Sequence, residues 1–236
     1  MPPSVSEGAV RVLVETLRLS RDRNRVQIAD IASSAKTIES FARKALTNAR
    51  IEHDGNWVSL SSGFRIRLAL DIARAGRLRD SARALTWQEF ERFAEECLEE
   101  AGFQTEKNVR VQGDGRAWQI DVVGFRGDLV VTMDCKHWNT PGYLSKFKLA
   151  AEHQRTATLH LLARPVEKTI RGDKELQALP VILTPSEPRG QLSEGVVLVS
   201  VEKLPSFLSG VTPYDENLPF ISSSLAVVEN PMSQSN

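Results

Sequence analysis

Residues 118–138 read WQIDVVGFRGDLVVTMDCKHW, and this stretch decides which fold the sequence predicts. Apolar and polar residues alternate in both halves, which is the period of a β-strand with one buried face. Between the halves, Phe125-Arg126-Gly127-Asp128 is typical of a turn. The stretch therefore predicts two strands joined as a hairpin.

Three charged side chains of this hairpin are expected on one face of the sheet. Asp134 and Lys136 are two residues apart and so project from the same side of their strand. If the hairpin closes around residues 125–128, Asp121 falls opposite Thr132, on that face and diagonal to Asp134. A slip of one residue would send Asp121 to the other face.

Helical patterns flank the hairpin. Thr86-Trp87-Gln88-Glu89 is a capping box that starts a helix ending near Gly102. Glu91 lies at the margin of its apolar stripe, and Glu95 points further outward. Further elements are expected over 143–162 (a long helix from Tyr143), 180–184 and 196–201 (strands) and 202–208 (a short helix). This order predicts an α/β fold with a mixed central sheet flanked by helices.

The N-terminal region predicts a winged helix-turn-helix. Helices are expected around 10–17 and over 26–32 and 36–48, the last with Ile38 on its inner face. A hairpin follows over 50–60, around Asp-Gly-Asn. We expect residues 1–75 to form this domain and a helical connector, 76–212 an α/β domain and 213–236 a tail.

Composition sets the cellular context. The 30 basic and 30 acidic residues cancel, so net charge neither favours nor excludes nucleic acid. Two cysteines form no disulfide framework and no zinc motif. No apolar run is long enough for a membrane span, and the N-terminus does not resemble a signal peptide. We expect a cytoplasmic protein.

The hairpin carries residues suited to phosphodiester hydrolysis. Asp121 and Asp134 offer the hard oxygen ligands that Mg²⁺ prefers, and the backbone carbonyl of Cys135 is a further candidate ligand. Lys136 can orient a water and stabilise developing charge. Glu91 is the expected fourth catalytic member.

Other residues near these positions have two readings. Gln154, on the long helix, either approaches the metal site or belongs to a polar helix face. Trp138 either contacts DNA or packs against that helix. His153 and His160 have no metal-ligand spacing, and we expect them on the helix surface or partly buried with partners.

In these motifs the sequence resembles the PD-(D/E)xK nuclease superfamily, and most closely Mrr-like restriction endonucleases and archaeal Holliday-junction resolvases. The resemblance covers residues 86–164. It rests on Glu89-Phe90-Glu91, Ala101-Gly102-Phe103, Gly113-Asp114-Gly115, Ile120-Asp121-Val122-Val123 and Met133-Asp134-Cys135-Lys136-His137-Trp138.

The resemblance implies a restriction-endonuclease-like core that cuts DNA with Mg²⁺, Mn²⁺ being able to substitute. It implies Glu91 as the helix acid, Asp121 and Asp134 as metal ligands and Lys136 as the catalytic lysine. It also implies a homodimer, since two cuts on a duplex call for two sites. The loop between Asp114 and Asp121 is longer than in the family, which makes Asp114 secondary.

Candidate DNA contacts lie outside the catalytic set. On the expected recognition helix and on the long helix they are Lys36, Thr37, Ser40, Arg43 and Lys44, and Lys146 and Lys148. For the first group the alternative is a domain that contacts protein or dimerises, and for the second a solvated helix face. An RNA or branched-DNA nuclease, or a DNA-binding regulatory or assembly protein with an inactive nuclease-like core, is the alternative function.

Overall fold

The computed structural model describes residues 6–23, 25–138, 144–164 and 175–224. The chain divides into two compact units, residues 1–93 and 94–236. The division falls within one continuous helix, α6 (Trp87–Glu100). The sequence-based boundary at residues 75 and 76 lies inside the first unit, and as a functional boundary it stays a prediction. Within the described ranges, no helix combines the length and hydropathy needed to cross a bilayer.

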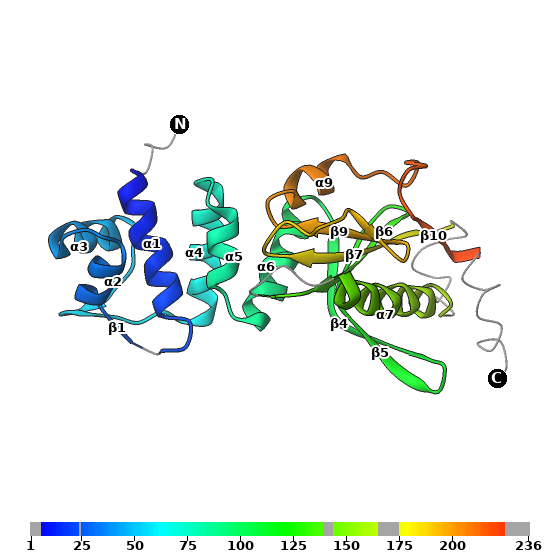
Figure 1. The fold of residues 1–236 in the computed structure, drawn as a ribbon, viewed down its shortest axis with the longest axis horizontal. Helices are drawn as coiled ribbons and strands as arrows, with labels where there is room; N and C mark the ends of the chain where they lie inside the picture. The colour runs from blue at the N-terminus through cyan, green and yellow to red at the C-terminus, as the bar shows by residue number, and fades with distance from the viewer. Residues whose placement is uncertain (1–5, 24, 139–143, 165–174, 225–236) are drawn as a thin grey trace. The chain divides into compact units, whose positions relative to one another are not determined.

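The first unit begins with three helices and three short strands (Figure 1). In chain order they are α1 (Glu7–Leu19), β1 (Val26–Gln27), α2 (Ile28–Ser34), α3 (Glu39–Asn48), β2 (His53–Asp54) and β3 (Trp57–Val58). The strands form an antiparallel sheet in the order β1-β3-β2. The hairpin expected over 50–60 is therefore present, with Gly55 at φ 58° in its turn.

Two helix predictions in this unit were partly wrong. Residues 26–27 are a strand that pairs with β3, and the helix follows them. The next helix starts at Glu39, because Lys36 adopts a left-handed turn conformation with φ 52°. Ile38 is then the N-cap of α3 and is 70% exposed, so it is not on the inner face.

The expected helical connector consists of α4 (Ser62–Arg74) and α5 (Leu78–Ala84). Between them Gly76 ends the helical conformation with φ 84°, a value that glycine adopts at little energetic cost. Within the same unit, the capping box at the start of α6 is confirmed by two reciprocal bonds. The amide of Glu89 donates to Thr86 Oγ1, and the amide of Thr86 donates to the Glu89 carboxylate.

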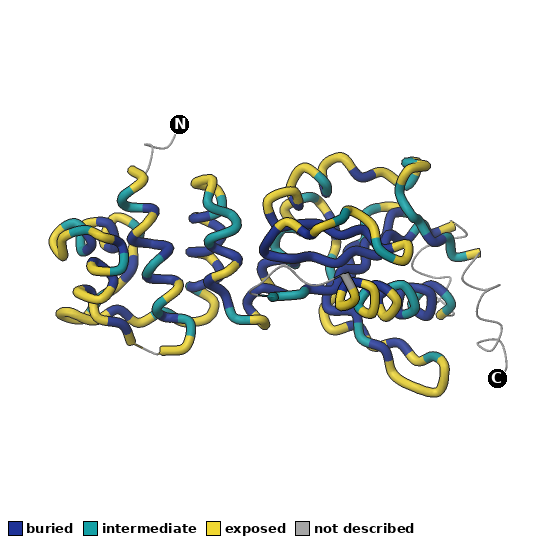
Figure 2. The backbone as a smooth tube through the Cα atoms, viewed as in Figure 1, coloured by how far each residue is buried: buried dark blue, intermediate teal, exposed yellow. Residues whose placement is uncertain are grey.

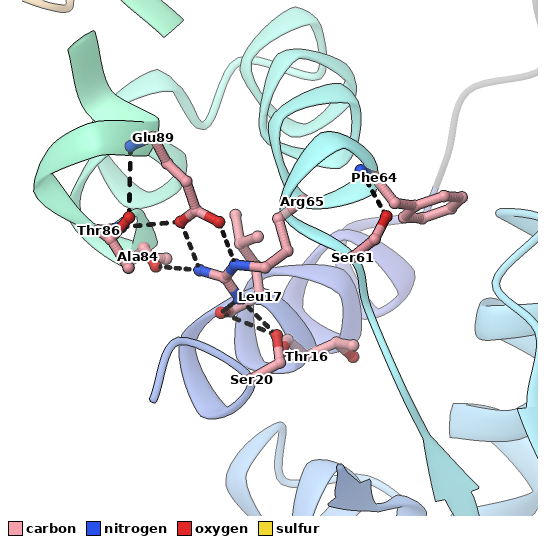
Figure 3. A network of polar contacts seen from close by, with 9 residues as sticks. All are labelled: Thr16, Leu17, Ser20, Ser61, Phe64, Arg65, Ala84, Thr86 and Glu89. Carbon is pink, nitrogen blue, oxygen red and sulfur yellow. Dashed lines mark hydrogen bonds and ion pairs between the residues drawn. The ribbon is translucent and has the colours of Figure 1, made fainter. Parts of the chain in front are cut away.

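A buried arginine joins these elements (Figure 3). The guanidinium of Arg65, on α4, lies 2.7 Å from Glu89 Oε1 and also donates to the carbonyls of Leu17 and Ala84 and to Ser20 Oγ. Arg65 is 3% exposed and Glu89 5%. Burial opposes ionisation of Glu89, but the hydrogen bond from Arg65 holds the pKa of the carboxyl below its usual value.

The second unit contains the rest of α6 and a mixed sheet (Figure 1). Its other elements are β4 (Gln104–Gly113), β5 (Arg116–Arg126), β6 (Leu129–Cys135), α7 (Leu144–Leu162), β7 (Gln177–Thr184), β8 (Leu192–Ser193), β9 (Val196–Ser200), α9 (Leu204–Gly210) and β10 (Ile221–Ser222). Over the described ranges the strand order is β4-β5-β6-β7-β9-β8, with β10 paired to the start of β7. β6, β7 and β9 are parallel, and the other pairs are antiparallel. The predicted α/β fold with a mixed sheet is thus confirmed.

The sequence did not predict three strands of this sheet, β4, β8 and β10. The edge strand β4 was missed because its residues are mostly polar and exposed. Strand β10 lies in the segment expected to be a tail, whose residues 225–236 are outside the described ranges. Tyr143, the expected first residue of the long helix, also lies outside them.

The two faces of the sheet are covered by different helices. A Cβ added at Gly124 of β5 would lie 3.1 Å from Leu98 of α6, whereas the neighbouring Val123 belongs to a cluster with Ala157 of α7. Every residue of β6 and β9 is buried, while the end of the β4–β5 hairpin is exposed (Figure 2). The core therefore lies at the central strands.

Candidate active site

Two carboxylates lie side by side at the end of the β5–β6 hairpin. Val122 pairs with Met133 and Val123 with Thr132, so this register puts Asp121 directly opposite Asp134. The expectation that Asp121 lies opposite Thr132 was therefore wrong by two residues. Because side chains alternate with a period of two, the shift leaves Asp121 on the expected face.

Backbone and lysine contacts hold the pair in place. Asp121 Oδ2 accepts a hydrogen bond of 2.8 Å from the amide of Cys135. Lys136 Nζ lies 2.8 Å from each carboxylate oxygen of Asp134. The expected i, i+2 relation between Asp134 and Lys136 thus brings their charges together. The Cys135 side chain is 1% exposed and belongs to the core.

Burial and the neighbouring carboxylate perturb the ionisation of Asp121. Burial raises the pKa of Asp121 most, and the negative charge of Asp134 raises it further, to about 6. The hydrogen bond from Cys135 and the charge of Lys136 act in the opposite direction but do not cancel these effects. The pair thus attracts a positive charge more than an isolated carboxylate would.

One side of this site is formed by α7. Thr158 Oγ1 donates to the carbonyl of Gln154, and it lies 2.6 Å from Thr132 Oγ1, so Thr132 donates to it. The side chain of Gln154 is fully buried. Further along, the ring of Trp138 lies 5.0 Å from that of Phe147, which confirms its packing against the long helix.

His153 is a feature that the sequence reasoning did not place at the site. Its ring lies 5.0 Å from that of Trp118, tilted by 46°, and the guanidinium of Arg116 lies 3.6 Å from the centre of the same indole. Burial lowers the pKa of His153, the positive charges of Lys136 and Arg116 lower it further, and Asp121 raises it. The i, i+2 spacing of Arg116 and Trp118 could have predicted their stack.

The two acids of α6 have different surroundings. Glu91 is 6% exposed, so it is more deeply buried than a position at the margin of the apolar stripe suggested. Its catalytic role stays a prediction. Glu95, its competitor, forms an ion pair of 2.8 Å with Lys107 of β4, which occupies its carboxylate at the sheet edge.

Asp114 is held at a different place. It lies in the β4–β5 turn with φ 52°, seven residues before Asp121 along the chain, and its carboxylate is 3.0 Å from Nε2 of His160. His160 is 4% exposed and contacts Trp118 as well. Asp114 is therefore part of the hairpin turn, which agrees with its expected secondary role.

The candidate DNA-binding residues of the first unit are not equivalent. Lys36, Ser40 and Lys44 are exposed, and Thr37 is half-buried. Arg43 instead donates to the carbonyl of Gly55 and to Glu39 and Asn56, so it joins α3 to the β2–β3 turn.

On α7, Lys146 and Lys148 are exposed, and Lys148 has two long ion pairs, with Glu152 and Glu194. Nothing in these contacts separates DNA binding from simple solvation. Both groups stay predictions.

Asp121 and Asp134 together offer two carboxylate ligands for a divalent cation. Within the described ranges, no group of three or more His, Cys, Asp or Glu side chains could hold a metal. Mg²⁺ commonly binds through one or two carboxylates and keeps several waters. The mutual repulsion of Asp121 and Asp134, seen in the raised pKa of Asp121, fits such an ion.

The geometry agrees with a family match. Residues 82–159 match the family model of the Mrr catalytic domain, described as a restriction endonuclease. This stretch is therefore similar to Mrr-type restriction endonucleases. The matched stretch contains Glu91, Asp121, Asp134 and Lys136, and the match supports a nuclease of the restriction endonuclease type.

Other comparisons add little to this match. Among curated proteins the sequence has no match. It is similar to the crystal structure of a protein of unknown function, AF1548, with 26% identity over 49% of this chain and 58% of that chain, and a TM-score of 0.35. It is also similar to protein VC1899 from Vibrio cholerae, with 13% identity over 86% of this chain and 49% of that chain, and a TM-score of 0.37. The chain thus spans about half of each structure, and both TM-scores are low.

Proposed function

We propose that the protein is a divalent-metal-dependent endonuclease that hydrolyses DNA phosphodiester bonds, with Mg²⁺ as cofactor and Mn²⁺ able to substitute. The observation that carries this proposal is the placement of Asp121 opposite Asp134, next to Lys136, inside the stretch that matches the Mrr family model. Paired carboxylates with an adjacent lysine suit phosphoryl chemistry because the developing charge is negative.

The proposed roles follow from the contacts. Asp121, Asp134 and the carbonyl of Cys135 would hold the cation, which supplies a polarised phosphoryl group and a water of lowered pKa. Lys136 is ion-paired with Asp134. With a cation bound at Asp134, the Lys136 ammonium would be able to orient a water and to stabilise the negative charge on the phosphate. Glu91 is the proposed helix acid.

The first unit is proposed to bind DNA as a winged helix. The element order α1-β1-α2-α3-β2-β3 with a three-stranded antiparallel sheet supports this assignment. Exposed Lys36, Ser40 and Lys44 suit phosphate contacts, whereas Arg43 serves the unit's own structure. We expect a homodimer acting in the cytoplasm.

A cleavage assay on the full chain tests the enzyme. Linear, methylated and four-way-junction DNA are incubated with Mg²⁺ or Mn²⁺, and binding is followed in parallel. Asp134→Ala and Lys136→Ala should each abolish cutting and leave binding largely intact. Asp114→Asn is the matched control, because that carboxylate contacts His160 in the hairpin turn, and it should keep cutting.

Two results would overturn the proposal. Undiminished cutting by Asp134→Ala would refute the site. DNA binding by the wild type without cleavage of any substrate would instead favour a regulatory or assembly protein with an inactive core.

A further inference from the structure

The side chain of Gln154 is buried without satisfying its polar atoms. It has no exposed surface, and in the described part of the chain neither its Oε1 nor its Nε2 has a hydrogen-bond partner. Burying an amide in this way is costly, and most buried polar groups have partners. The unpartnered amide of Gln154 therefore indicates that a ligand binds beside it.

Two contacts fix where Gln154 lies along the sheet. Thr158 of α7 is in contact with Thr132 of β6. Phe147, nearer the start of α7, contacts Trp138, which follows β6. As β6 and β7 are parallel, α7 must run back along β6 in the opposite direction. Gln154 lies between these two contacts.

The rise per residue along α7 and along β6 places Gln154 at the same height on the sheet as Asp134. From Thr158 to Gln154 the helix rises about 6 Å. From Thr132 to Asp134 the strand rises about 7 Å in the same direction. The neighbouring residue His153 agrees with this position, because the charges of Lys136 and Asp121 both act on its pKa.

We propose that Gln154 supplies a neutral amide oxygen to the divalent cation held by Asp121 and Asp134, directly or through a bound water. This inference rests on the proposed function. Side-chain amide oxygens are ligands that hard divalent cations accept. A neutral ligand adds no charge to a site where two carboxylates already repel each other. Gln154 is thus a positioning residue for the cation, contributed by α7.

Mn²⁺ binding to the full chain, measured by calorimetry without DNA, tests this role. Gln154→Leu and the nearly isosteric Gln154→Met should weaken Mn²⁺ binding about tenfold or more. Gln154→Glu should strengthen it, because a third carboxylate attracts the cation. Thr156→Val is the matched control. It removes a partly exposed hydroxyl of the same helix, which donates to the carbonyl of Glu152, and should leave Mn²⁺ affinity unchanged.

Thermal unfolding gives a second readout that needs no catalysis. Without metal, Gln154→Met should have a higher Tm than wild type, because an unsatisfied amide is replaced by an apolar group. Saturating Mn²⁺ should then raise the Tm of the variant less than that of wild type.

The outcomes separate this inference from the function it rests on. If Gln154→Met binds Mn²⁺ like wild type while Asp134→Asn loses binding, the role of Gln154 is overturned and the proposed site stands. If wild type and Asp134→Asn bind Mn²⁺ equally weakly, the proposed metal site itself fails, and the role of Gln154 fails with it.

Discussion

Asp121 destabilises the metal-free protein when it ionises. Its pKa in the folded protein is about 6, above the ordinary aspartate pKa of 3.8, so the folded state binds the proton more tightly than the unfolded chain. The stabilisation from this proton is complete below about pH 4 and is lost as pH rises through 6. A shift of this size corresponds to something on the order of 3 kcal/mol.

Asp121→Asn should remove this pH dependence. At pH 7.5 without metal, the variant should unfold at a higher temperature than wild type, because no second charge is buried beside Asp134. Its carbonyl can still accept from the amide of Cys135. Mg²⁺ should raise the Tm of wild type and hardly change that of the variant. Parallel Tm-against-pH curves for both proteins between pH 4 and 7.5 would contradict the assignment.

Arg65 presents the opposite case, a buried charge whose partners are all in place. Arg65→Met leaves the Glu89 carboxylate buried without its guanidinium and should cost about 3–5 kcal/mol in urea unfolding. Arg74→Met, on the same helix, breaks an exposed pair with Asp71 and should cost less than about 1 kcal/mol. Equal losses would show that the network contributes little.

At the scale of elements, the β4–β5 hairpin and α7 meet at a point with no spare room. A Cβ at Gly113 would lie 2.1 Å from the ring of His160. Gly113→Ala should therefore destabilise the protein by about 1–3 kcal/mol. Gly210→Ala, where a Cβ meets nothing within 4 Å, is the control.

A double variant identifies the cause of that loss. Adding His160→Ala to Gly113→Ala removes the clash, so the two effects should not add. Additive losses in chemical denaturation would mean that the clash with His160 is not the reason.

The β5–β6 hairpin shows how far its sequence predicts the site. Alternation placed both strands, and a turn of four residues was assumed over 125–128. The observed turn holds only Gly127 and Asp128, because Arg126 pairs with Leu129. Shortening a turn by two residues slides the register by two, which keeps each side chain on its face. The convergence of the acids was thus predictable, and their direct opposition was not.

Contacts between distant elements lay beyond the sequence patterns. Strand β4 is a polar edge strand, and Asn108, opposite Asp121 in the register, has φ 51°. That break disturbs the alternation from which strands are recognised. The contact of His153 with Trp118 depends on the position of α7 across the hairpin, which no local pattern encodes.

At the scale of the whole molecule, the zero net charge makes DNA binding depend on local basic residues. Lys36→Gln and Lys44→Gln should each weaken DNA binding on all sequences and lower the slope of log K against log salt by about 1. Lys203→Gln, which breaks an exposed pair with Glu187 in the second unit, is the control. Filter binding at several salt concentrations measures the slopes. Unchanged slopes would favour a first unit that contacts protein instead.

The position of Trp118 has a spectroscopic consequence. Its indole contacts two tilted imidazole rings, those of His153 and His160, and the guanidinium of Arg116. A protonated imidazole quenches indole emission, so the fluorescence of this residue reports the charge of its neighbours. The difference spectrum between wild type and Trp118→Phe isolates this signal from the other three tryptophans. Because the pKa of His153 is lowered, the emission should stay bright at neutral pH and dim only in acid. The protein thus carries an intrinsic optical reporter beside its site.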